Sequence, residues 1–150
     1  MNKGSKIKIG VTLLAILIFV GGYLVLDKLT GGQKGDKTII ITIKDEVNKK
    51  TIVENKKYKT DAANLSDFLI QYKDELKVDM QTSKYGRFIE AIGGVKTEDM
   101  AKGPWWMYGY KSPSQNKEMK VGEAPGADQL VLYDKDEINL VFTSNMNVGK

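Results

Sequence analysis

The sequence predicts an α+β domain, in which a mixed β-sheet carries one main helix, preceded by an N-terminal transmembrane helix. Three observations predict this. An unbroken apolar run occupies residues 9–26, later segments alternate between apolar and polar residues, and residues 65–76 repeat their apolar residues with helical spacing. Because helices do not alternate regularly with the strands, a doubly wound nucleotide-binding fold is disfavoured.

The composition excludes several classes of function. The chain has 150 residues with no cysteine and no histidine, and its formal net charge is +4. A disulfide framework, a thiol nucleophile, a Ser-His-Asp triad and the common zinc sites are therefore excluded. A carboxylate-based hydrolase and an oxygen-ligand calcium site stay compatible with the sequence, but we predict no catalytic residue, no metal site and no cofactor. Four lysines and one aspartate fall within residues 1–28, so the remainder is nearly balanced and we expect no nucleic-acid partner.

Residues 9–26 have the length and composition of a transmembrane anchor. At about 1.5 Å per residue, such a helix spans about 27 Å, close to the hydrocarbon thickness of a bilayer. Lysines precede the run, so the positive-inside rule places residues 1–8 in the cytoplasm as a short tail and the rest of the chain outside. A cleaved signal peptide is the alternative, although its apolar region is usually shorter. We expect a single-pass protein in the cell membrane of a Gram-positive-type bacterium, with a flexible linker at residues 27–36.

The first two predicted strands, residues 38–44 and 51–54, form a hairpin around a polar turn. In the first strand three isoleucines alternate with other residues, as expected where one face of a sheet is buried. Three lysines flank Tyr58 just after the second strand. Since lysines protect the edges of sheets from pairing with other chains, we interpret them as a solvated edge rather than a polyanion site.

Residues 65–76 are predicted to form the main helix. Asn64 can cap its first turn, with Asp67 three positions later. Five apolar residues form a core-facing helical stripe: Leu65, Phe68, Leu69, Tyr72 and Leu76. The adjacent carboxylates Asp74 and Glu75 do not face each other on a helix, so they belong to its solvated side rather than to a catalytic pair.

Short strands follow the helix. Apolar alternation and turn residues predict them at residues 78–82, 88–92, 105–110 and 138–142. The order of two strands, a helix, several short strands and a long last strand suggests a β-grasp-like layout. This extracellular domain is expected to cover residues 37–146, and residues 147–150 are expected to fray.

The strand that contains both tryptophans is the main candidate for a functional surface. Trp105 and Met107 fall on one face, and Trp106, Tyr108 and Tyr110 fall on the other. A half-buried strand needs only one apolar face, so we expect the Trp105 side to face the core. The Trp106 side would then be a partly exposed platform, suited to a corrinoid ring, a sugar ring or the apolar patch of a partner.

Several sequence blocks resemble a known family. They are Tyr-Gly-Arg-Phe-Ile-Glu-Ala-Ile-Gly-Gly-Val at residues 85–95, Trp-Trp-Met-Tyr at residues 105–108, and the segments 122–127, 132–136 and 138–142. In this order they resemble a bacterial surface-domain family that is named after the C-terminal domain of transcobalamin and intrinsic factor. The likeness covers roughly residues 37–143.

The resemblance implies a β-grasp domain that captures a small molecule outside the cell. Cobalamin or a related corrinoid is the implied ligand, and a vitamin transporter in the same membrane is an implied partner. Two departures limit this inference: the large helical domain of the animal carriers is absent, and Lys135 stands where many bacterial relatives have glycine. The candidate ligand-binding residues are Tyr85, Trp105, Trp106, Tyr108 and Tyr110.

Three classes of function stay open at this point. The first is a membrane-tethered, extracellular small-molecule-binding module without catalysis. The second is a cell-envelope protein-interaction or structural domain that docks a surface protein through the same platform. The third is an enzyme, for which Asp134 and Asp136 form the best carboxylate pair. On a tight turn such residues more often accept backbone hydrogen bonds, so we predict no catalysis.

Overall fold

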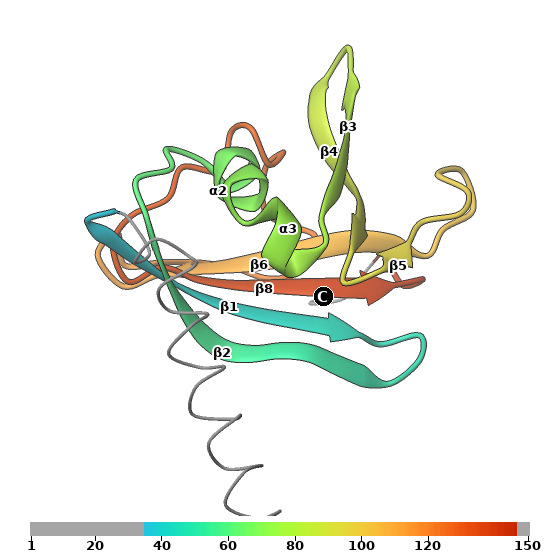
Figure 1. Ribbon diagram of the computed structural model, residues 1–150, viewed down its shortest axis with the longest axis horizontal. Helices are drawn as coiled ribbons and strands as arrows, with labels where there is room; N and C mark the ends of the chain where they lie inside the picture. The colour runs from blue at the N-terminus through green and yellow to red at the C-terminus, as the bar shows by residue number, and fades with distance from the viewer. Residues whose placement is uncertain (1–34, 147–150) are drawn as a thin grey trace, which may run out of the picture. The chain divides into compact units, whose positions relative to one another are not determined.

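The structure is a computed structural model that describes residues 35–146 (Figure 1). The predicted anchor at residues 9–26 and the predicted tail at residues 147–150 lie outside the described residues. Within the described part, no helix has both the length and the apolar character needed to cross a membrane. Residues 35–146 form a sheet-dominated α+β domain, which confirms the α+β part of the predicted fold class.

The main element is a five-stranded mixed sheet in the order β2-β1-β8-β6-β7. Its strands are β1 (Lys37–Asp45), β2 (Lys50–Thr60), β6 (Trp105–Ser112), β7 (Lys117–Met119) and β8 (Glu137–Thr143). The strands β1 and β8 lie parallel in the middle of the sheet, and the other neighbours are antiparallel. The predicted hairpin of β1 and β2 is therefore present, with β2 longer than expected and located at a sheet edge.

Two short helices, α2 (Leu65–Gln71) and α3 (Lys73–Leu76), lie across one face of this sheet (Figure 1). The single predicted helix is divided because Tyr72 leaves helical geometry, with φ −103° and ψ 22°. Asn64 caps α2 as predicted, since its side-chain oxygen accepts the backbone N–H of Asp67 at 2.8 Å. All five residues of the predicted apolar stripe are buried.

A second, three-stranded sheet consists of β3 (Asp79–Ser83), β4 (Gly86–Ile92) and β5 (Val95–Lys96). The hairpin of β3 and β4 rises on the same side of the main sheet as the helices (Figure 1). Pairing between Ser83 and Gly86 leaves Lys84 and Tyr85 as the turn at its tip. Among the elements of residues 35–146, the helices and this hairpin lie on one face of the main sheet, and no helix or strand covers the other, which we call its open face.

The core lies on the covered face of the main sheet. The three alternating isoleucines of β1 are 0% exposed, as the sequence pattern predicts. The rings of Tyr58, Phe68 and Tyr72 pack together with centroid distances of 4.7–5.7 Å. The lysines on either side of Tyr58 are exposed on the edge strand β2, so the predicted solvated edge is confirmed.

Candidate functional site

The two faces of β6 are the reverse of those predicted. Trp106 and Tyr110 are only 6% and 4% exposed and belong to the core, with Tyr108 packed partly against it. Trp105 and Met107 lie on the opposite face and are half-buried. Cross-strand neighbours share a face of the sheet. The core-facing residues of β6 pair with three buried residues of β8, namely Phe142, Leu140 and Ile138. The prediction of an exposed Trp106 platform is therefore wrong.

Backbone carbonyls of β5 and of the loop after β7 accept hydrogen bonds from two of these core-facing aromatic residues. Trp106 Nε1 donates to the carbonyl of Val95, and the Tyr108 hydroxyl donates to the carbonyl of Pro125, each at 2.8 Å. Burial raises the pKa of Tyr108 to about 12, so its hydroxyl stays a neutral donor at physiological pH. Trp106 thus connects β6 to β5, and Tyr108 connects β6 to the loop that contains Pro125.

Tyr110 binds a buried carboxylate. Its hydroxyl donates to Asp136 Oδ2 at 2.5 Å, and the same oxygen accepts the backbone N–H of Tyr133 at 2.8 Å. Burial and this hydrogen bond raise the pKa of Tyr110. Asp134 accepts the backbone N–H of Thr38 at 2.8 Å. Both carboxylates of this turn thus accept backbone hydrogen bonds, as expected from their position.

The other candidate residues lie on different elements. Tyr85 is 82% exposed in the hairpin turn, with the Lys84 ammonium 5.0 Å from the centroid of its ring. Trp105 begins β6, and its Nε1 donates to the carbonyl of Met100 at 2.8 Å. The five predicted ligand-binding residues are therefore divided among the core, the hairpin tip and the opposite face of the sheet, and they do not form one site.

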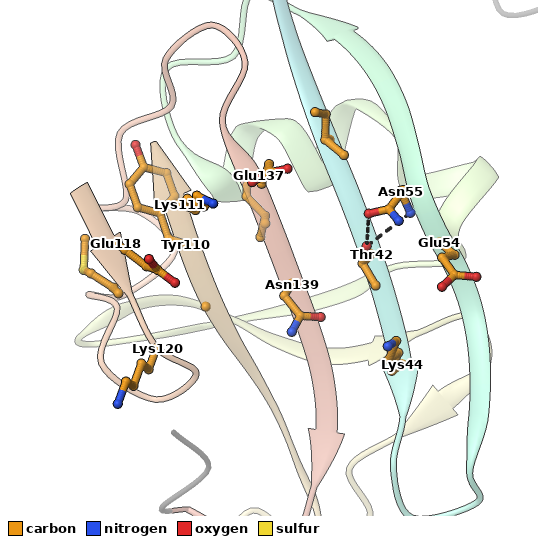
Figure 2. Close-up of a pocket in the computed structure, with 14 residues that line it drawn as sticks. Thr42, Lys44, Glu54, Asn55, Tyr110, Lys111, Glu118, Lys120, Glu137 and Asn139 are labelled. Carbon is orange, nitrogen blue, oxygen red and sulfur yellow. Dashed lines mark hydrogen bonds between the residues drawn. The ribbon is translucent and has the colours of Figure 1, made fainter. Parts of the chain in front are cut away.

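A different site is present on the open face of the main sheet. Residues from all five strands line a groove of about 390 Å³ there (Figure 2). Six of the lining residues are charged: Lys44, Glu54, Lys111, Glu118, Lys120 and Glu137. We call this site the open-face groove.

Strand pairing places one row of charged side chains across the groove. Glu118, Lys111 and Glu137 are neighbours on β7, β6 and β8. Ile40 on β1 continues the row next to Glu137 and is only partly buried. Lys57 on β2 pairs with Ile40 and is exposed, so opposite charges alternate along the row, with one apolar side chain between Glu137 and Lys57.

A second row, one step along the strands, is uncharged. Gly109, Asn139 and Thr42 are neighbours on β6, β8 and β1. Asn55 of β2 extends the row, because its backbone N–H donates to Thr42 Oγ1 at 3.1 Å (Figure 2). A Cβ on Gly109 would lie 3.1 Å from the backbone nitrogen of Val121. Glycine at this position thus lets the chain after β7 pass close to the sheet.

The polar side chains of the open-face groove are largely unpaired. Across residues 35–146 there are four salt bridges, and none includes a charged residue of the groove. The Asn139 amide is exposed and has no hydrogen-bond partner within the same part of the chain. The three lysines and three glutamates of the lining carry no net charge together. These donors and acceptors are therefore available to a bound molecule.

Sequence reasoning missed the open-face groove because five strands contribute to it, and their register is not evident from local patterns. One signal was present: Thr42 and Asn139 are polar residues that alternate with buried residues in β1 and β8. They mark the outward faces of these two strands. Only the pairing of the strands brings them together.

A separate charged cluster joins the hairpin to other parts of the covered side. Arg87 Nε lies 2.8 Å from Asp128 Oδ1, and Arg87 Nη2 lies 3.0 Å from Asp67 Oδ1. The backbone N–H of Arg87 is the main cause of the lowered pKa of Asp128, and the Arg87 guanidinium also lowers it. These groups satisfy one another, so we regard the cluster as structural. Metal-type clusters of three or more His, Cys, Asp or Glu side chains are not found among residues 35–146.

Comparisons with known proteins give likenesses to solved structures only at the level of the fold. No family model matches this chain, and no curated protein matches it. The fold is similar to the 1.30 Å crystal structure of a candidate metal-binding protein from Ruminococcus gnavus, with a TM-score of 0.54 and 24% identity. The match covers 73% of this chain and 99% of that chain. At this level of identity, the likeness supports the fold alone.

Proposed function

We propose that this protein is a membrane-tethered, extracellular module that binds a small molecule in the open-face groove without catalysing a reaction. The groove itself is the observation that carries the proposal. Its volume of about 390 Å³ falls in the range of small-molecule sites. Its charged side chains form no salt bridge within residues 35–146, and most of its lining residues are carried by strands, which hold side chains more rigidly than loops do.

The arrangement of the domain supports this proposal. The strands β1 and β8 form a parallel central pair, and β2 and β6 are their antiparallel neighbours. Together with the helices on one face of the sheet, this arrangement is consistent with a β-grasp-like layout. It leaves the second face of the sheet open within the described residues. The sequence blocks that resemble the transcobalamin-type bacterial surface family support an extracellular location. An anchor at residues 9–26 and a linker at residues 27–36 would hold the domain near a vitamin transporter in the same membrane.

Cobalamin or a related corrinoid is the ligand that the resemblance favours. A corrinoid ring is broad, so it would need contacts beside the groove, where Met107 and Trp105 are half-buried on the same face. Titration of the full-length protein with cyanocobalamin should then quench the fluorescence of Trp105. The absence of binding at about 100 µM, or about −5.5 kcal/mol, would reject the corrinoid.

A thermal-shift screen of small polar compounds tests the groove more generally. A ligand that binds only the folded state raises stability by about 2.7 kcal/mol at a hundred times its Kd. The substitution Asn139→Trp places a large side chain on an exposed floor position of the groove and should abolish the response. Gln115→Trp, at an exposed turn outside the groove lining, is the matched control. If every stabilising compound still acts on Asn139→Trp, the groove is not the site.

A cell-envelope interaction domain is the second candidate function. The observation in its favour is Tyr85, which is 82% exposed at the tip of a projecting hairpin beside Lys84. A photo-cross-linking residue placed at position 84 should then capture a surface protein on intact cells. Tyr85→Ala should abolish this cross-linked product while leaving the thermal stability unchanged. If the Tyr85→Ala variant still gives the same cross-linked product, the hairpin tip is not the docking point.

A further inference from the structure

We infer that the ligand of the open-face groove is a neutral, polyhydroxylated molecule, specifically a saccharide of one or two rings. The inference rests on the proposed function and goes beyond it by naming the chemical class of the ligand. It depends on three features of the groove: the balance of its charges, the pairing of its donors with acceptors, and the partly buried isoleucine in its charged row.

The balance of charges disfavours ions as ligands. Lys111 has a glutamate on each neighbouring strand, Glu118 on β7 and Glu137 on β8. An anion that approached the lysine would be repelled by both carboxylates, and a cation near either carboxylate would be repelled by the lysine. Since neighbouring strands are about 4.8 Å apart, no part of this row is of one sign. A neutral ligand avoids these repulsions.

The donors and acceptors suit hydroxyl groups. Each sugar hydroxyl both donates and accepts a hydrogen bond, and vicinal hydroxyls lie side by side. The Lys111 ammonium only donates and the Glu137 carboxylate only accepts, so this adjacent pair complements two neighbouring hydroxyls. In the second row, the Asn139 amide offers both functions from one side chain, and it is free of protein partners within the described residues.

The volume of the groove and the isoleucine in its charged row fit a sugar ring. Asn139 on β8 and Thr42 on β1 form the uncharged floor beside Gly109, where the chain after β7 passes close to the sheet. Ile40 lies in the charged row between Glu137 and Lys57 and is only partly buried. A pyranose has C–H groups on its faces and hydroxyls on its rim, so the isoleucine can cover part of a face while the polar rows bind the rim. The volume of about 390 Å³ limits the ligand to one or two rings.

Saturation-transfer difference NMR on the full-length protein tests the inference, because it detects weak ligands of large particles. The protein is kept in a detergent without a sugar head group, since a glycoside detergent would compete for the groove. Cellobiose, maltose and chitobiose are the neutral probes, and inorganic phosphate, glutamate and spermidine are the charged probes in parallel titrations. At least one disaccharide should bind with a Kd in the millimolar range or tighter. Its Kd should change less than about twofold between 50 and 500 mM NaCl, because screening does not act on a neutral ligand.

Two groove variants locate the binding. Asn139→Trp should weaken disaccharide binding at least tenfold by filling the groove, and Asn139→Ala should weaken it at least threefold by removing one amide. Gln115→Trp should leave binding unchanged. The milder alanine variant keeps the test decisive if the tryptophan variant does not fold.

The outcomes separate this inference from the proposed function. In one outcome no disaccharide binds, but a charged probe or another compound binds and loses its binding in Asn139→Trp. The saccharide class is then wrong, and the groove remains a binding site. If a disaccharide binds equally to both Asn139 variants, the sugar site lies elsewhere and the inference is overturned. If no compound of any class depends on Asn139, both proposals fail.

Discussion

The burial of Trp106 allows the arrangement of β6 to be tested quantitatively with Trp106→Ala. This side chain is 6% exposed. A tryptophan buries about 200 Å², which corresponds to about 5 kcal/mol at about 25 cal/mol per Å². Alanine retains part of this burial, but the carbonyl of Val95 loses its donor. We therefore expect the free energy of unfolding to fall by about 4 kcal/mol, as is usual for buried Trp→Ala changes.

Urea unfolding of the full-length protein in detergent, followed by circular dichroism, measures this loss. Trp105→Ala is the matched control, since Trp105 is the neighbouring residue on the half-buried face and its indole donates to an exposed loop. We expect that variant to lose only about 1–2 kcal/mol. Equal losses in the two variants, or a loss below about 1 kcal/mol for Trp106→Ala, would refute the placement of Trp106 in the core.

Three further predictions concern stability. The pKa of Asp128 is lowered by its arginine partner. The stability that this carboxylate adds is therefore present above the unfolded pKa of about 3.9 and is lost as pH falls through the folded pKa. Asp128→Asn should therefore reduce the fall in unfolding free energy, measured with urea, between pH 7 and pH 2. Tyr110→Phe removes a donor from the buried Asp136 carboxylate and should cost about 1.5–3 kcal/mol in thermal unfolding. Gly103→Ala would place a Cβ 2.6 Å from an indole atom at φ +73° and should lower the Tm more than Gly94→Ala, where φ is +80° with open space. An unchanged pH profile, an unchanged Tm or equal effects of the two glycine changes would contradict the respective predictions.

Local sequence patterns predicted most of the individual elements. The alternating isoleucines identified β1 and its inward face, because burial of one sheet face imposes a period of two. Asn64 marked the start of α2, and the apolar stripe identified the buried side of both helices. The break at Tyr72 was not predicted, since the apolar spacing continues through it. The parallel pairing of β1 with β8 was also beyond local patterns, because it joins segments from opposite ends of the domain.

The candidate site was harder to predict for a related reason. Both faces of β6 carry apolar residues, so alternation separated Trp105 from Trp106 correctly but did not indicate which face turns inward. The pairing of β6 with β8 determines that direction. The open-face groove likewise needs the register of five strands. Its members Thr42 and Asn139 are ordinary outward-facing polar residues until that register brings them together.

The central pairing of β1 and β8 also has a mechanical consequence. The two strands run in the same direction and are in register from Ile40 opposite Glu137 to Asp45 opposite Phe142. A force applied to the start of β1 and the end of β8 would slide one strand along the other. The evenly spaced hydrogen bonds of a parallel pair would then carry the load together instead of opening one by one. If the domain is tethered through the chain before β1, as we propose, its sheet is oriented to resist tension between the membrane and whatever holds its far end.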